Sequence, residues 1–261
     1  MLRRYALGLC LILGVGLAAR AQESTEPPPP VAAPRVSVMA EELPRAGAIV
    51  VFGADQTLGR ETVKALVAAH RQVVAILPEG ADKAPFADLK VETMSADPMS
   101  AEQLKTMFTS APVRAVVTAL DVTGDRPAFG AEGTRNIIDA TKAANLPRLV
   151  LVSATGAGDS AALLPWYVRF LRGEKIAAAG TAETHLKNSG LDYTIVRSGW
   201  ILADETSNPT AVLQDTGAQF SWIAAADLAR LVAGVVDAKP MSGKTTTAVD
   251  PARASLWSIL F

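Results

Sequence analysis

The sequence predicts a single α/β domain built on a doubly wound, Rossmann-like parallel sheet with helices on both faces. Two observations carry this prediction. Several short runs are apolar at every position, as strands covered on both faces are. Segments with helical spacing separate these runs, so each crossover brings the chain back to a parallel neighbour. With 261 residues, 49% of them hydrophobic, the chain can bury one sizeable core.

The first two strands are expected at 48–52 and 73–77. Both are continuous apolar runs, ended by Gly53 and by the turn sequence Pro-Glu-Gly. Between them, residues 57–70 have the spacing of an amphipathic helix. The apolar residues on its inner face are Leu58, Val63, Leu66 and Val67.

The next elements follow the same alternation. Ser100 and Gln103 stand at the spacing of a capping box, which predicts the start of a helix. Ile137 and Ile138 mark the inner face of a later helix. The remaining predicted strands are 91–95, 113–120, 148–154, 193–198 and 245–249, and the remaining predicted helices are 100–110, 132–145, 174–188 and 227–236.

The turn after the first strand reads GADQTLG, in the place where a doubly wound sheet holds a dinucleotide. Gly53 suits the tight turn, and Gly59 suits close packing of helix on strand. Gln56 stands where a middle glycine would let the backbone approach the pyrophosphate, so its side chain should crowd that group. A positive φ at Gln56 would add strain. The helix N-terminus still offers N–H groups to a phosphate, so we expect weakened binding; the alternative is a tight turn with no ligand.

Four segments carry a resemblance to a known family: VVFGADQTLG, AEGTRNIIDATKAANLPRLVLVSATGAG, AETHLKNSGLDYTIVRSGWIL and WIAAADLARLVAGVVD. They resemble the NmrA-like, NAD(P)-binding group of the atypical short-chain dehydrogenase/reductase superfamily. Asp55 and Gln56 depart from the family loop, which reads roughly V-x-G-A-T-G-x-x-G, and Ser198 replaces a usual proline. The resemblance implies NAD or NADP as cofactor. The residues it places at the cofactor are Gly53, Ala54, Gln56, Thr57, Leu58, Gly59, Glu79, Asp97 and Ala119.

The end of the second strand selects between the two cofactors. An acid there binds the ribose hydroxyls of NAD, whereas an arginine binds the extra phosphate of NADP. Pro78 replaces the arginine of the family, and Glu79 follows it. A carboxylate repels a 2′-phosphate, so the sequence favours NAD. An ordinary surface turn at these residues is the alternative, in which case no cofactor is selected.

Ser153 ends the fifth strand where the serine of the family stands, and it is the candidate catalytic residue. A hydrogen-bonding residue at a strand end is the alternative. The Tyr-x-x-x-Lys pattern of short-chain dehydrogenases fails, because Leu171 follows Tyr167 at the lysine spacing. The lysine of atypical members would fall at Ala179, and Lys175 lies one helical turn earlier, about 6 Å along the axis. The sequence therefore shows no intact acid–base set.

The aromatic residues and histidines indicate a ligand pocket or a metal site only weakly. Trp166, Tyr167, Phe170 and Trp200 could line a pocket over the carboxyl edge of the sheet, or pack under the end of the chain. A metal site is not expected. The chain has two histidines and one cysteine, and His185 has an acid nearby but no third ligand.

The N-terminal part departs from the α/β pattern. An uncharged run over 5–19 follows two arginines, and the small-x-small sequence at 19–21 predicts cleavage before Gln22. This indicates export, to the periplasm or outside the cell, with an uncleaved membrane anchor as the alternative. Four consecutive prolines then favour an extended spacer. The predicted divisions of the chain are a signal peptide at 1–21, a Pro-rich linker at 22–45 and an NAD(P)-binding domain at 46–261.

The net charge of the chain, which is close to zero, limits the classes of partner that the protein can attract. Lys and Arg total 25 against 26 Asp and Glu, which gives no general attraction to nucleic acid. The expected partner is a dinucleotide or small molecule, with a protein partner left open and membrane contact only through an uncleaved N-terminus. Two functions compete: an exported NAD(P)-binding protein with weak oxidoreductase activity, and a non-catalytic binding or assembly module that kept the fold. A sugar-nucleotide isomerase is disfavoured by the missing Tyr/Lys pair.

Overall fold

In the computed structural model of the chain, the described residues are 47–121, 127–164, 166–203, 205–215 and 220–253, which belong to one compact unit. The predicted signal peptide at 1–21 and linker at 22–45 lie outside them. So do residue 46 and residues 254–261 of the predicted domain. No helix in the described ranges is both long and apolar enough to cross a membrane.

The main sheet has eight strands in the order β3-β2-β1-β4-β5-β6-β10-β8. The strands are β1 (Ala48–Phe52), β2 (Val73–Leu77), β3 (Glu92–Ser95), β4 (Val113–Thr118), β5 (Leu149–Ala154), β6 (Tyr193–Ser198), β8 (Val212–Gln214) and β10 (Lys244–Val249). All neighbours pair in parallel except β8, which runs antiparallel to β10 at the edge. From β1 the strand order runs outward through β2 and β3, and from β4 it runs the opposite way through β5, β6 and β10. The predicted doubly wound fold is therefore confirmed.

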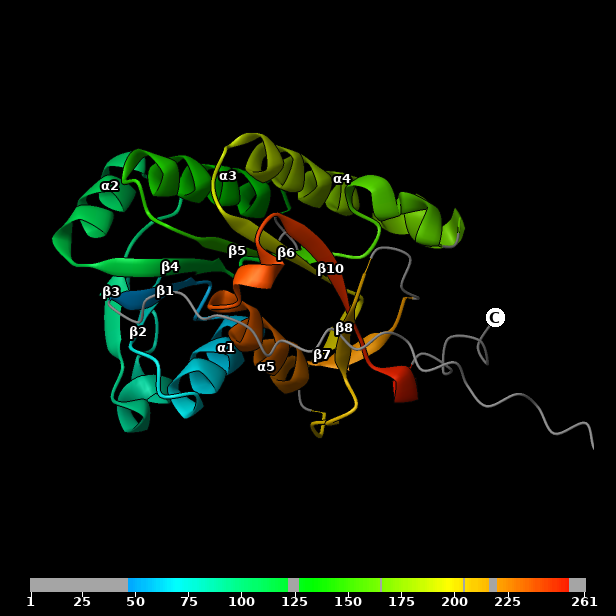
Figure 1. The fold of residues 1–261 in the computed structure, drawn as a ribbon, viewed down its shortest axis with the longest axis horizontal. Helices are drawn as coiled ribbons and strands as arrows, with labels where there is room; N and C mark the ends of the chain where they lie inside the picture. Colours follow the sequence, from blue (N-terminus) through cyan, green and yellow to red (C-terminus); the bar gives the residue numbers. More distant parts are fainter. Residues whose placement is uncertain (1–46, 122–126, 165, 204, 216–219, 254–261) are drawn as a thin grey trace, which may run out of the picture. The chain divides into compact units, whose positions relative to one another are not determined.

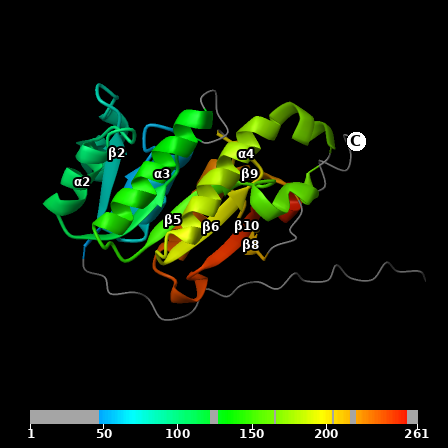
Figure 2. The same ribbon diagram turned by 90° about the horizontal axis from the view of Figure 1, so that it is seen from above.

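Helices cover both faces of this sheet (Figure 1). The helices are α1 (Thr57–Ala68), α2 (Ala101–Ser110), α3 (Pro127–Ala143), α4 (Trp166–Asn188) and α5 (Ala225–Val236). One face carries α1 packed on α5, and the other carries α2, α3 and α4, with α3 and α4 side by side (Figure 2). Each face has its own buried apolar cluster. Alternate residues of β1 divide between the two, because successive strand side chains point to opposite faces.

Several element boundaries differ from the sequence prediction. The helix expected at 174–188 begins earlier, at Trp166, and Gly173 lies inside it. The helix expected at 132–145 begins at Pro127, a residue that the first turn of a helix accepts. The capping box is only half formed. The Ser100 side chain accepts a hydrogen bond from the Gln103 N–H (3.4 Å), but the Gln103 side chain accepts from the Asp97 N–H instead (2.9 Å).

Short elements absent from the prediction complete the fold. Strands β7 (Trp200–Leu202) and β9 (Trp222–Ala224) pair in parallel as a separate small sheet. Each has three residues, too few to show a periodic pattern in the sequence. Within the described ranges, three short 3₁₀ helices lie at 84–89, 158–163 and 239–241. The small sheet stands at the carboxyl end of β6 and supplies part of the site.

Candidate functional site

The turn between β1 and α1 depends on its two glycines. Gly53 has a φ of +75°, and a Cβ there would lie 2.8 Å from the carbonyl oxygen of Ala119. A Cβ on Gly59 would overlap the carbonyl oxygen of Gly53. Ala54 is fully buried between them. The glycine positions therefore have the two roles expected from the sequence, the tight turn and the close packing of α1.

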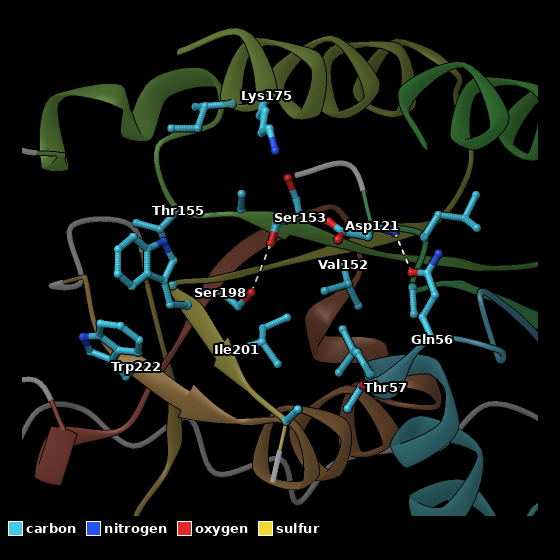
Figure 3. Close-up of a pocket in the computed structure, with 18 of the residues that line it drawn as sticks. Gln56, Thr57, Asp121, Val152, Ser153, Thr155, Lys175, Ser198, Ile201 and Trp222 are labelled. Atoms are coloured by element: carbon cyan, nitrogen blue, oxygen red, sulfur yellow. Dashed lines mark hydrogen bonds between the residues drawn. The ribbon is translucent and has the colours of Figure 1, made fainter. Parts of the chain in front are cut away.

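Gln56 occupies the helix N-cap and is not strained. Its φ of −89° and ψ of 158° are extended backbone, so the strain that a positive φ would have caused does not arise. The side-chain oxygen Oε1 accepts a hydrogen bond from the backbone N–H of Asp121 (2.9 Å). This bond joins the loops that follow β1 and β4, across the point where the strand order reverses (Figure 3). The Gln56 amide thus lies in the crevice where a doubly wound sheet binds its ligand.

A cavity of about 920 Å³ opens at the carboxyl edge of the main sheet. Of the residues predicted at a cofactor, Gln56, Thr57, Leu58 and Ala119 line it, and so does the predicted catalytic Ser153. The other predicted residues lie elsewhere: Gly53, Ala54 and Gly59 are buried in the turn, whereas Glu79 and Asp97 are exposed after β2 and β3. The last two lie on the β2 side of the reversal point, where the adenosine half of a dinucleotide binds.

The far end of the cavity is walled by aromatic rings, two from the small sheet and one from Phe220, which precedes β9. The Trp200 ring meets the Phe220 ring edge to face at 6.0 Å and the Trp222 ring at 4.4 Å, both between centroids. Leu164 and Val168 add aliphatic surface. Of the aromatic residues proposed from the sequence, Trp200 lines the cavity.

Trp166 and Phe170 do not line this cavity. Their exposed fractions are 73% and 83%, since the first turns of α4 extend beyond the sheet. The side chain of Tyr167 lies outside the described part. Sequence reasoning missed Phe220 and Trp222, and the WIAAADLARLVAGVVD segment was the one signal near them.

A buried ion pair lies beneath Ser153. The Ser153 hydroxyl donates to Glu183 Oε1 (2.7 Å), and the Arg197 guanidinium holds both oxygens of that carboxylate, at 2.9 and 2.6 Å. Asp159 adds a second acid on Arg197 (2.6 Å). The four residues come from β5, α4, β6 and the 3₁₀ helix at 158–163, so the network fixes the end of β5 against its neighbours.

The charges of this network act on one another. A hydrogen bond from Arg197 holds the pKa of Asp159 below its usual range, against the smaller effect of burial. Burial alone would lower the pKa of Arg197, but the hydrogen bonds and charges of Glu183 and Asp159 outweigh it and raise that pKa. The hydroxyl proton of Ser153 is engaged by Glu183 Oε1, so the Ser153 oxygen can meet a further partner only as a hydrogen-bond acceptor.

Lys175 also lines the cavity, although it stands one turn before the lysine position of the family. Figure 3 shows its amine pointing from α4 into the cavity on the side of Ser153. Ala179, at the family position, is buried in the helix packing. Lys175 lies inside the helix predicted at 174–188, and its place in the cavity lining depends on how α4 crosses the sheet, which helical spacing from Glu183 does not contain.

Histidine chemistry is absent from the cavity lining. His185 Nε2 pairs with Asp139 Oδ1 on α3 (2.7 Å), whereas Glu183 turns inward to Arg197. Within the described ranges, no three His, Cys, Asp or Glu side chains gather as a metal site would require.

The residues around the turn fit a dinucleotide, with one obstacle. The first turn of α1 holds no acidic residue, and its N-cap side chain makes no hydrogen bond to the helix, so the N-terminal N–H groups remain available to a phosphate. The tight glycine turn brings these groups to the cavity. The obstacle is the Gln56 amide, which a pyrophosphate at this position must displace. The fold and the turn together define a Rossmann-type dinucleotide-binding protein.

Comparison with known proteins agrees. A family model described as NAD(P)H-binding matches residues 53–239, so the chain belongs to this NAD(P)H-binding family. The sequence matches no curated protein.

Solved structures share the fold. ChuY from Escherichia coli O157:H7, described as an anaerobillin reductase, aligns with a TM-score of 0.69 and 23% identity over 78% of this chain and 97% of its own. The oxidoreductase ylbE from Lactococcus lactis gives 0.68 and 17% over 82% and 96%. A short-chain dehydrogenase/reductase from Veillonella parvula, in complex with NADP, gives 0.63 and 18% over 80% and 96%.

Proposed function

We propose that the chain is an NAD(P)H-dependent oxidoreductase that acts on a substrate held between Ser153 and the aromatic walls. One observation carries this proposal: a single cavity runs from the β1–α1 turn, past the end of β5, to the rings of Trp200 and Trp222. A cofactor bound at the turn and a substrate at the rings would therefore share one space. The description of ChuY as a reductase and of ylbE as an oxidoreductase supports the same class.

The bound cofactor would supply a hydride, and the chain would supply position and charge. The N–H groups at the start of α1 would hold the pyrophosphate, with Thr57 and Leu58 beside it. Ser153 would accept a hydrogen bond from cofactor or substrate, because its own proton is held by Glu183. Ser153 stays the predicted catalytic residue on these grounds, as an orienting acceptor.

We propose NAD rather than NADP as the preferred cofactor. Glu79 follows β2, which is the neighbour of β1 in the sheet. Its side chain is exposed and could contact a ribose. A 2′-phosphate there would meet a carboxylate without a compensating arginine at position 78, which is proline. Glu79→Arg should reverse the ratio of the two dissociation constants, while an unchanged ratio would count against this role.

The experiment for cofactor binding is thermal unfolding of the purified chain with NAD, NADH, NADP and NADPH in turn. A ligand at a hundred times its Kd adds about 2.7 kcal/mol to the unfolding free energy, which corresponds to roughly 5–10 °C for a domain of this size. A shift should be followed by a screen for cofactor oxidation with reducible aromatic compounds. No shift with any of the four would favour the alternative, a non-catalytic binding module.

Export is proposed from the N-terminal sequence alone. If the signal at 1–21 is cleaved, mass spectrometry of the protein recovered outside the cytoplasm should find Gln22 as the first residue. A chain that begins at Met1 and stays with the membrane fraction would point to an anchor instead.

A further inference from the structure

The cavity has two chemically different ends. The end at the β1–α1 turn is polar, with Asp55, Gln56 and Arg60 among its lining residues. The opposite end, which we call the aromatic end, is defined by Leu164, Val168, Trp200, Phe220 and Trp222. Rings and aliphatic groups leave a surface suited to a flat apolar body.

One charged side chain of the described lining comes from a helix that also contributes to this end. Among the described residues, four charged side chains line the cavity: Asp55, Arg60, Asp121 and Lys175. The first two belong to the β1–α1 turn and α1, and Asp121 follows β4. Lys175 alone comes from α4, the helix that also supplies Val168. Its amine points into the cavity (Figure 3) and has no hydrogen-bond or ion-pair partner among the described residues.

From this juxtaposition we infer that the substrate is a planar apolar carboxylate, with its rings at the aromatic end and its carboxylate on Lys175. An ammonium beside apolar walls is satisfied best by a partner of opposite charge. A single ammonium balances a single negative charge, which a carboxylate carries. A phosphate monoester carries nearly two and would leave one of them desolvated and unpaired. The inference names the substrate of the proposed reductase and so rests on that function for turnover, although not for binding.

Binding can be tested without turnover, with 2-naphthoate and its uncharged counterpart 2-naphthamide as probes. Isothermal titration of the full chain, in the absence of dinucleotide, should give tighter binding of naphthoate, and added salt should weaken naphthoate but not naphthamide. Lys175→Gln should weaken naphthoate by about tenfold or more, as expected for a lost charge-assisted hydrogen bond. The same variant should leave naphthamide unchanged, and Lys175→Arg should retain most of the preference for the acid.

Arg169→Gln is the matched control. It removes one positive charge from the same helix at an exposed position outside the cavity lining, and it should leave both affinities at the wild-type value. Equal wild-type affinities for acid and amide, no binding of naphthoate, or a Lys175→Gln variant that binds naphthoate normally would each overturn the inference. Because no dinucleotide is present, failure of cofactor binding in the unfolding experiment would refute the proposed reductase and leave this result standing.

Discussion

Replacing Gln56 by alanine and then by glycine separates two obstacles to cofactor binding. The Gln56 amide holds the Asp121 N–H at 2.9 Å, and a pyrophosphate in the crevice must break that bond. A hydrogen bond of this kind is worth about 1 kcal/mol net, so its loss on binding weakens the cofactor by about fivefold. Gln56→Ala should recover this factor. Gln56→Gly should tighten binding further, because it also removes the Cβ from the path of the phosphate.

The same variants should lose stability while they gain affinity. The free chain loses the bond between the two loops, about 1 kcal/mol, or roughly 2–4 °C in Tm. The negative φ of Gln56 means that alanine fits this backbone without strain. Titration calorimetry with NADH and NADPH measures the affinity, and thermal unfolding without ligand measures the stability.

Asn136→Ala serves as control for this pair of effects. It removes a side-chain amide that donates to the Pro98 carbonyl (3.1 Å) outside the cavity lining. This variant should lose comparable stability and keep the wild-type affinity. Unchanged or weaker cofactor binding in both Gln56 variants would refute the account of Gln56 as an obstacle.

Three further predictions concern the framework of the site. Gly59→Ala places a methyl group against the Gly53 carbonyl and should cost about 1–3 kcal/mol of unfolding free energy; an unchanged urea midpoint would contradict this packing. Glu183→Gln leaves Arg197 charged and buried without its main counter-charge, so chemical denaturation should show that the free energy of unfolding falls by about 3–5 kcal/mol. A decrease below about 1 kcal/mol would mean that water replaces the carboxylate. Because the folded pKa of Asp159 is lowered, its ion pair stabilises the fold above the unfolded pKa of about 4 and loses this effect as the pH falls through the folded value. The stability difference between wild type and Asp159→Asn should therefore be constant near neutral pH and shrink in acid, whereas a difference that grew in acid would exclude the ion pair as its source.

The main sheet could be predicted from sequence because burial on both faces leaves a direct mark. Strand β6 runs over the predicted residues 193–198, and β1 and β2 also match. Strands β7 and β9 could not be predicted, because three residues show no period and because their pairing joins segments about twenty residues apart. The start of α4 was missed for a different reason. Glycine is a weak helix former, which favours a helix boundary at Gly173, but α4 continues through this residue.

The site shows the same division between local and distant information. The turn with Gly53 and Gly59 is contiguous, so its geometry followed from the sequence. The partner of Ser153 did not, because Glu183 lies thirty residues away and only the fold brings its carboxylate to the end of β5. Spacing along the helix alone places Lys175 one turn before the lysine position of the family. Its access to the cavity depends on how α4 crosses the sheet, which spacing along one helix does not contain.

The separate small sheet has a consequence for how such a chain can diversify. Trp200 and Trp222 sit on β7 and β9, whose backbone bonds join these two strands only to each other and not to the eight-stranded ladder. Mutations or short insertions there can reshape the aromatic end of the cavity while the glycine turn and both apolar clusters stay intact. Exchange of residues 199–203 and 220–224 between relatives is thus a practical way to alter which ligands the cavity accepts without changing the main sheet.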